Sequence, residues 1–225
     1  MDMATKWETL SKQAEVLEQQ GSIAAAEAMW LSALEETRSM QPDDLRAAYT
    51  VDCLADITNR QDKVVLAELF FKQAVHLRTQ ALGPDHVAVA ASLNNLAKFY
   101  YIRGKFGNSE ALTRRFVEIY ETSLGEYHPN VATGLHNLAT LYHMQADYDA
   151  AEPVYRRALS IREKSLGADH PDTVKLIKNL ATLMQSTHRE EEAAQLSERV
   201  SGSITGSWKV VELPEEGLLR QEQDA

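Results

Sequence analysis

A short motif recurs three times in this sequence at one fixed spacing. Leu82-Gly83-Pro84-Asp85-His86 reappears from Leu124 to His128 and again from Leu166 to His170, an offset of 42 residues each time. The tripeptide Asn-Leu-Ala recurs with the same offset, beginning at residues 95, 137 and 179. A fixed period of roughly 20–50 residues is typical of stacked supersecondary units, each of which buries its apolar face against its neighbours. The period therefore predicts a solenoid.

The apolar pattern inside each period predicts two helices per repeat. Leu10, Ala14 and Leu17, for example, lie at i, i+4 and i+7, which places them on one face of a helix. Gly21 follows as a helix terminator. The same pattern predicts an all-α solenoid of about five helix pairs, which form one domain over residues 1–200. The expected repeats span about 5–40, 43–81, 86–123, 128–165 and 170–200, and Pro42 is expected in the first turn of the second repeat.

Residue size at equivalent positions predicts how the helices pack. Small residues let a neighbouring helix approach closely, and large ones fill the remaining space. The small positions are Ala14, Ala55, Ala97, Ala139 and Ala181, and the large ones are Trp30, Phe71 and Tyr155. The third repeat departs from this pattern, because Ser109, Thr113 and Phe116 stand where alanine, an aromatic residue and alanine are expected. That seam is either repacked or a docking site.

The repeat pattern ends near Val200, and residues 201–225 form a C-terminal extension. Residues 201–207 are rich in Ser and Gly and predict a linker. Residues 207–213 have extended character, and a polar tail follows. Trp208 and its apolar neighbours favour a contact of some kind. The segment is expected to cap the last repeat, to occupy the groove of its own chain or to bind another molecule.

Composition and motifs exclude several functions. The net charge of −10 opposes general binding to nucleic acid or to anionic membranes. A single cysteine, Cys53, excludes an intramolecular disulfide and is expected to be a buried structural thiol. No signal peptide or membrane-spanning stretch is recognised, so a cytoplasmic location without membrane insertion is expected. No phosphate loop, nucleophile elbow or zinc motif occurs, so no enzyme activity and no cofactor is expected.

The recurring histidines His86, His128 and His170 invite comparison with a metal site. They lie one per repeat, on successive loops about 10 Å or more apart. Zinc needs its ligands within about 2–2.3 Å of one ion. These histidines are therefore expected to support helix starts or loop hydrogen bonds, and no metal site is predicted.

The repeat residues resemble the tetratricopeptide repeat, in the 42-residue version found in kinesin light chains. The resemblance is carried by Leu-Gly-x-x-His-Pro at 124–129 and 166–171, by the Asn-Leu-Ala tripeptides and by the segment 148–159. It implies a right-handed superhelical solenoid and a non-enzymatic scaffold or adaptor that binds a peptide or partner protein in a concave groove. The alternative is an assembly subunit that self-associates, or joins a larger complex, through the repeat ends and the C-terminal tail.

The resemblance also implies which residues face the groove. The residue two before the small alanine, namely Asn95, Asn137 and Asn179, is expected to bond the backbone of an extended peptide. Alternatively, these asparagines bond to neighbouring helices. Other expected groove residues are Lys98, Tyr101, His136, His143, Lys175 and Lys178 in the C-terminal half, and Asp52, Asp56 and Arg60 in the N-terminal half. The groove is thus expected to be acidic at its N-terminal end and basic at the other, where an acidic or carboxylate-bearing peptide fits.

Overall fold

The computed structural model describes residues 3–41 and 43–201, and the chain forms ten helices over this part. No strand occurs within these ranges. The helices are α1 (Met3–Gln19), α2 (Ile23–Thr37), α3 (Arg46–Arg60), α4 (Val64–Leu82), α5 (Val87–Ile102), α6 (Phe106–Leu124), α7 (Pro129–Met144), α8 (Tyr148–Leu166), α9 (Pro171–Ser186) and α10 (Glu190–Ser201). The predicted all-α solenoid of five helix pairs is confirmed.

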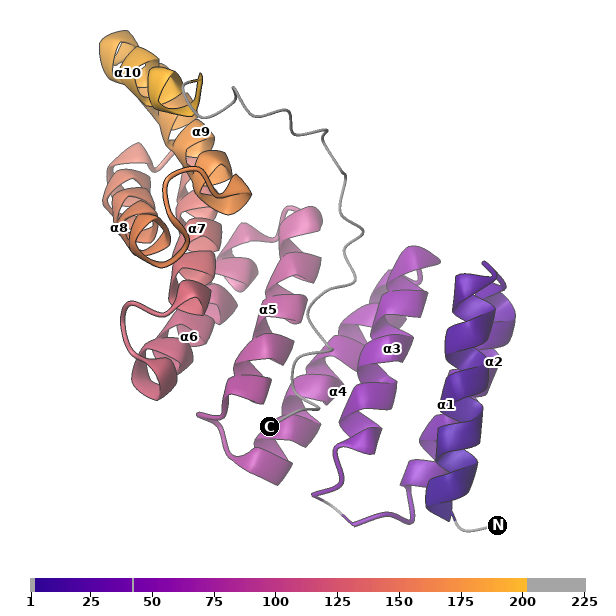
Figure 1. Ribbon diagram of the computed structural model, residues 1–225. Coiled ribbons are helices and arrows are strands. Elements are labelled where there is room, and N and C mark those ends of the chain that lie inside the picture. Colours follow the sequence, from indigo (N-terminus) through magenta and orange to yellow (C-terminus); the bar gives the residue numbers. More distant parts are fainter. Residues whose placement is uncertain (1–2, 42, 202–225) are drawn as a thin grey trace.

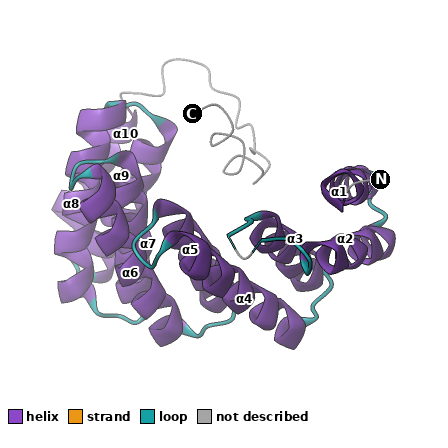
Figure 2. Cartoon of the chain, turned by 90° about the horizontal axis from the view of Figure 1, so that it is seen from below, coloured by secondary structure: helices purple, strands orange, loops and turns teal. Residues whose placement is uncertain are grey.

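Each odd-numbered helix packs against the even-numbered helix that follows it, and each even-numbered helix packs against the next pair. The five pairs follow one another from α1 to α10 without doubling back (Figure 1). Seen along the helices, the pairs describe an arc, with the odd-numbered helices on its inner side and the even-numbered helices outside (Figure 2). Because the helix pairs touch only their neighbours in sequence, the fold is stabilised pair by pair.

The turn within each pair needs one residue in the left-handed conformation. Gly21 and Gly104 supply it in the first and third pairs, with φ of 74° and 68°. Asp62, Ala146 and His188 occupy the equivalent places with φ of 56°, 59° and 58°. The prediction that Gly21 ends the first helix is confirmed, and three repeats make the same turn without glycine, although L-residues rarely adopt this conformation.

The recurring histidines start the inner helices. In His86, His128 and His170 the ring Nδ1 accepts a hydrogen bond from the backbone N–H two residues later, at 3.1, 3.1 and 3.2 Å. This contact satisfies one of the N–H groups that the first turn of a helix leaves without a partner. The expected role at helix starts is confirmed.

The second repeat begins later than the sequence suggested. Helix α3 starts at Arg46 rather than near Asp43, and Pro42 lies outside the described residues. The carboxylate of Asp44 accepts the backbone N–H of Arg46 at 2.9 Å and also pairs with its guanidinium. This local bond gives residue 44 an alternative to helical hydrogen bonding, which is why the helix starts after it.

Small and large residues fill the core as expected. The five alanines at the predicted small positions are at most 6% exposed, and Trp30, Phe71 and Tyr155 are at most 4% exposed. The buried apolar residues form two clusters that divide within α5. Leu96, Phe99 and Tyr100 join the N-terminal cluster, whereas Val89, Ala90 and Leu93 join the C-terminal one. Helix α5 therefore ties the two halves of the solenoid together.

The irregular third repeat is repacked rather than open. Phe116 is buried, and it occupies the space beside Gly134 of α7, where an added Cβ would lie 2.5 Å from the Phe116 ring. Ser109 is buried as well and donates a hydrogen bond to the Ala97 carbonyl at 2.8 Å. A large residue on one helix is thus matched by the loss of a side chain on the other, which leaves no room at this seam for a docking partner.

The predictions for the C-terminal extension fall outside the described residues. They comprise the linker, the extended segment at 207–213, the polar tail and the role of Trp208. Helix α10 completes the fifth pair, with Ala193, Leu196 and Val200 buried in the C-terminal cluster.

Candidate partner-binding surface

The inner face of the arc is formed by α1, α3, α5, α7 and α9 (Figure 2). Every predicted groove residue in the repeats lies on one of these helices. Asp52, Asp56 and Arg60 lie on α3, Asn95, Lys98 and Tyr101 on α5, His136, Asn137 and His143 on α7, and Lys175, Lys178 and Asn179 on α9. The repeat period therefore brings to one face residues that are spread over more than a hundred positions of the chain.

The three predicted asparagines make different contacts. Asn137 donates from Nδ2 to Oδ1 of Asn94 at 3.2 Å, and Nδ2 of Asn179 lies 2.7 Å from Nε2 of His136. Within the described ranges Asn95 has no side-chain hydrogen bond. Two of the amides therefore contact the preceding inner helix, as the alternative interpretation expected. Each of these two retains a carbonyl oxygen and one N–H for a further partner.

His136 is a neutral member of this network. Its pKa is lowered to about 4, mainly by burial and secondly by the nearby cations Lys175 and Arg162. The unprotonated Nε2 can therefore accept the hydrogen bond of Asn179, and its ring lies 6.0 Å from that of Tyr155. Burial also lowers the pKa of His143, whose ring packs edge-on to Tyr148 at 5.6 Å. Neither histidine adds positive charge to the surface at neutral pH.

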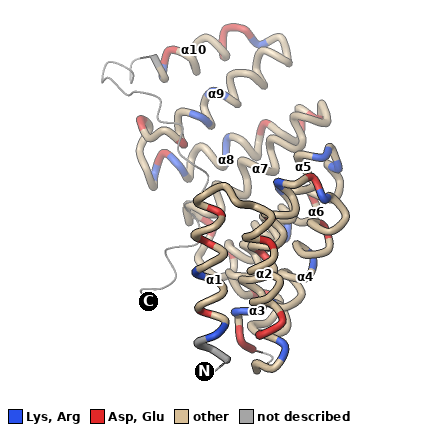
Figure 3. Tube along the Cα trace, turned by 90° about the vertical axis from the view of Figure 1, so that its right-hand side faces the viewer, with Lys and Arg blue, Asp and Glu red and all other residues tan. Residues whose placement is uncertain are grey.

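The positive charge of the C-terminal half comes from lysines. Lys175 and Lys178 are exposed on α9, and neither has an ion pair or a hydrogen bond from its ammonium group to any described residue. Lys98 is exposed on α5. Figure 3 marks the lysine positions of α9 in blue and the acidic positions along α1 in red. The predicted difference in charge between the two ends is present among the described residues.

The N-terminal half is acidic. The Asp56 side chain is partly exposed, but its neighbours desolvate the carboxylate; this desolvation, followed by the nearby carboxylates of Asp52 and Glu18, raises the pKa of Asp56 to about 6. Arg60 lies 3.5 Å from Glu18, and the Tyr49 hydroxyl donates to Glu15 at 3.1 Å. The carboxylates therefore outnumber the cations that approach them, and the inner face of α1 and α3 is negative.

Asp52 does not line the surface as predicted. Its side chain is 6% exposed and pairs with Arg78 of α4, whose guanidinium also donates to the Ser92 hydroxyl at 2.6 Å. Arg78 thus connects α3, α4 and α5 inside the solenoid. The sequence analysis placed Asp52 by its register alone and missed Arg78, which supplies the reason for its burial.

Arg162 is a second residue that the sequence analysis missed. It lies on α8 at the register of Arg78, two periods later, and its side chain is 10% exposed. It donates to Asp172 at 2.7 Å and to the Thr133 hydroxyl at 2.8 Å. Arg78 and Arg162 occupy the same repeat position, and this recurrence could have been noticed in the sequence. An arginine that recurs at one repeat position indicates a structural role between helices.

An apolar pair lies at the ends of two adjacent inner helices. Ile102 and Met144 are 62% and 55% exposed and occupy equivalent positions on α5 and α7. Tyr101 lies beside them, with its ring 5.9 Å from that of Phe106. Exposed apolar side chains next to hydrogen-bonding groups suit contact with a protein partner. The 42-residue offset between Ile102 and Met144 was visible in the sequence.

The described residues hold neither a metal-ligand cluster nor an activated thiol. They contain no group of three histidine, cysteine or carboxylate side chains placed to hold a metal ion. Cys53 is partly buried, and burial together with nearby carboxylates raises the pKa of its thiol well above the usual value, which disfavours a reactive thiolate. None of the described helices is long and apolar enough to cross a membrane.

Solved structures similar to this chain are repeat proteins. The crystal structure of BtubC (BKLC) from P. vanneervenii superposes with a TM-score of 0.77 at 22% identity, covering 94% of this chain and 85% of that one. A putative kinesin light chain of Podosopora anserina with nearly identical TPR-like repeats gives a TM-score of 0.75 at 21% identity, covering 90% and 97%. The apo form of RapI gives 0.81 at 13% identity, covering 93% and 56%. At these identities the likeness establishes the fold.

The family model for the tetratricopeptide repeat matches residues 43–121, 89–164 and 147–201, which together span most of the chain. No curated protein sequence matches the chain significantly. The matched segments coincide with the helix pairs and with the motif that recurs from Leu82, Leu124 and Leu166. The chain therefore belongs to the tetratricopeptide repeat family.

Proposed function

We propose that this chain is a protein-interaction scaffold that binds an extended segment of a partner protein across the inner face of α5, α7 and α9. Repeat folds of this family generally serve as non-enzymatic interaction scaffolds, and their partners are proteins. The observation that carries the proposal is the pair Lys175 and Lys178, which are exposed on the inner helix α9 without a partner among the described residues.

Other groups suited to an extended chain lie on the same inner helices. Asn137 and Asn179 each keep an amide oxygen and an N–H beyond their inter-helix bonds, and both can pair with a peptide group whatever its side chain is. Ile102 and Met144 are exposed at the C-terminal ends of the inner helices α5 and α7 and offer apolar contact there. A carboxylate on the bound segment, from an acidic side chain or a C-terminus, would form charge-assisted hydrogen bonds with the lysines.

Capture of partners by the full chain tests this proposal. The variant Lys175→Glu/Lys178→Glu should lose most of the protein captured from a native lysate, as measured by quantitative mass spectrometry against the unmodified chain. Lys164→Glu is the matched control, because Lys164 is an exposed lysine on the outer helix α8, beside the Tyr127 ring. Equal capture by both variants would contradict the proposal.

Asn95→Ala tests separately whether the inner-face asparagines bind the partner. Since Asn95 has no hydrogen bond in the described part of the chain, its removal should weaken capture with little change in thermal unfolding. Asn137→Ala and Asn179→Ala each remove an inter-helix bond as well, at a cost of about 0.5–1.5 kcal/mol of stability. Weaker capture in proportion to lost stability would indicate that the asparagines are structural.

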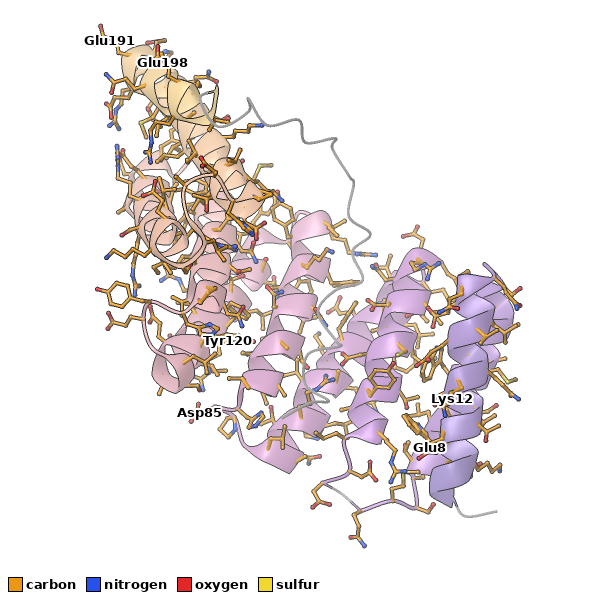
Figure 4. The ribbon with its side chains drawn as sticks, viewed as in Figure 1. Glu8, Lys12, Asp85, Tyr120, Glu191 and Glu198 are labelled. Carbon is orange, nitrogen blue, oxygen red and sulfur yellow. The ribbon has the colours of Figure 1, made fainter. Side chains whose placement is uncertain are left out.

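A second candidate function is assembly through the first helix pair of the solenoid. An apolar depression of about 460 Å³ lies between α1 and α2, lined by Lys12, Gln13, Val16, Leu17 and Met29. Figure 4 locates Lys12 on α1 at this end. Light scattering after size exclusion tests the role. A concentration-dependent oligomer that is lost in Val16→Glu, or on deletion of residues 203–225, would favour assembly over binding at the inner face.

A further inference from the structure

We propose that the segment bound on the inner face carries separated charges, with cationic side chains over α1 and α3 and acidic side chains over α9. This inference rests on the proposed function and adds the chemistry of the partner to it. It commits to a polypeptide whose two charged ends both contact the face, rather than to a partner that is acidic throughout.

The register of the inner helices shows where the charge changes sign. One row of equivalent positions begins with Glu15 on α1 and Asp56 on α3 and continues with Lys98 on α5, where the sign reverses. A second row begins with Glu8 on α1 and ends with Lys175 on α9. Figure 4 shows the position of Glu8 on α1. Opposite charges at the two ends of one continuous face favour a ligand with the complementary order.

The acidic end lacks sufficient positive charge of its own. Asp56 lies within the influence of the Asp52 and Glu18 carboxylates, and of the two cations that oppose them, Arg60 is also engaged by Glu18. The cations that act on Asp56 are Lys98 of α5 and Arg60. A lysine or arginine side chain from a partner would neutralise carboxylates that now repel one another.

Apart from Lys98 on α5, the predicted binding residues in the middle of the face carry no charge. The row that ends with Lys178 on α9 passes through Asn94 on α5 and His136 on α7, and burial keeps His136 uncharged at neutral pH. Thr140 and Thr182 continue the row of Lys98. The two charged ends are therefore separated by polar groups that can bond a peptide backbone of any sequence.

Packing geometry sets the spacing of charges in the ligand. Neighbouring helices lie about 8–10 Å apart, so the three steps from α3 to α9 span roughly 30 Å. An extended chain covers about 3.3 Å per residue, so its charged groups should be about nine residues apart. A uniformly acidic segment of that length would meet Glu15 and Asp56 at one end, and a uniformly basic one would meet Lys175 and Lys178 at the other.

Fluorescence anisotropy with synthetic peptides and the full chain tests this inference. Each of two charge-split peptides carries a pair of lysines and a pair of glutamates about nine residues apart. One peptide has the lysines near its N-terminus and the other has them near its C-terminus. An isomer of identical composition alternates the charges, and a fourth peptide carries only glutamates. We expect one charge-split peptide to bind about tenfold more tightly than the alternating and all-acidic peptides at low ionic strength.

Charge-reversal variants separate this inference from the proposed function. Glu15→Lys/Asp56→Lys should move the preference to the all-acidic peptide, whereas Lys175→Glu/Lys178→Glu should abolish tight binding of both, and circular dichroism confirms that the variants are folded. The inference is wrong if the all-acidic or alternating peptide binds the unmodified chain as tightly as the charge-split peptides do. The proposed function still stands in that case if Lys175→Glu/Lys178→Glu weakens the binding of that peptide. Failure of all four peptides to bind would overturn both.

Discussion

The joint between the second and third repeats and the joint between the third and fourth occupy equivalent positions but are packed by opposite chemistry. In the first joint Arg78 of α4 pairs with Asp52 and donates to Ser92 of α5. In the second, Phe116 of α6 fills the space beside Gly134 of α7. Gly134 stands at the register of Ser92, and Tyr120, whose ring lies 4.6 Å from that of Phe116, stands at the register of Arg78.

The difference shows that the repeat fixes the spacing of the helices but not which side chains fill the space between them. The charged joint depends on two side chains that must both be present, because a lone buried ion is costly. The aromatic joint depends on matched volumes, because a close-packed interior tolerates neither a void nor an extra carbon. The next joint, between the fourth and fifth repeats, again contains a buried arginine, Arg162, which pairs with Asp172.

The aromatic joint should respond most strongly to a loss of volume. Phe116→Ala removes a buried ring and should lower the free energy of unfolding by about 3–5 kcal/mol, because neither Gly134 nor the surrounding backbone can fill the space. Urea denaturation followed by circular dichroism measures the change.

A rebuilt joint is the control for this prediction. Phe116→Ala/Gly134→Leu reproduces the alanine–leucine pairing found at Ala158 and Leu176, which are both buried. Gly134→Leu alone overpacks the site and should cost about 1–3 kcal/mol or more. The double variant should be more stable than the sum of the single changes implies. Strict additivity would show that the two positions do not share one space.

The charged joint should respond to removal of one ion. Asp52→Ala leaves the guanidinium of Arg78 buried without its carboxylate and should cost about 3 kcal/mol of unfolding free energy. Asp56→Ala is the matched control, because this aspartate lies one turn away on the same helix and is exposed. If the two variants unfold at the same urea concentration, the buried ion pair does not stabilise the joint.

The acidic inner face should make stability depend on pH through Asp56. Its pKa rises from 3.8 to about 6 in the folded chain, so folding favours the protonated form and the unmodified protein loses stability as the pH rises from about 4 to above 6. Asp56→Asn should therefore unfold like the unmodified chain near pH 4 and be more stable near pH 7.5, by less than about 1 kcal/mol because the side chain is exposed. Urea denaturation at the two pH values is the measurement, and equal effects at both would contradict the assignment.

The turns within the helix pairs should show the smallest effects. Ala146 adopts the left-handed conformation, which costs an L-residue about 1–2 kcal/mol, and Ala146→Gly removes this strain. Glycine also makes the unfolded chain more flexible, which offsets about 0.4–1 kcal/mol of the gain. The net stabilisation should be several tenths of a kcal/mol in thermal unfolding. Gly104→Ala makes the reverse change at an equivalent turn with open space around it, and it should destabilise the fold. A loss of stability in Ala146→Gly would show that the methyl group makes contacts that outweigh the strain.

Residues that depend on local pattern could be predicted from the sequence, and those that depend on a distant partner could not. His86, His128 and His170 were expected at helix starts because they recur immediately before the apolar pattern, and a helix start needs an acceptor there. The start of α3 at Arg46 was missed, because the bond between Asp44 and Arg46 competes with the helix and the period does not indicate it.

The candidate surface divides in the same way. The family resemblance, applied at the repeat period, predicted which residues face the groove, and the expected charge difference between the two ends followed from their residue types. Asp52 was assigned to the surface, but the sequence analysis did not link it to Arg78, which lies 26 positions away on another helix and holds it inside. Whether Asn137 and Asn179 bond a neighbouring helix was likewise open until their distances to Asn94 and His136 were known.

The 42-residue period by itself determined the helix pairs and the solenoid, because regular stacking assigns every repeat position the same place relative to its neighbours, and the family resemblance added which positions face inward. Only the tertiary structure decided how each joint is filled and which polar side chains remain available. Those outcomes depend on pairs such as Phe116 with Gly134 and Arg78 with Asp52. Each pair joins different helices, and its energy depends on a separation of a few ångströms that no single position in the chain encodes.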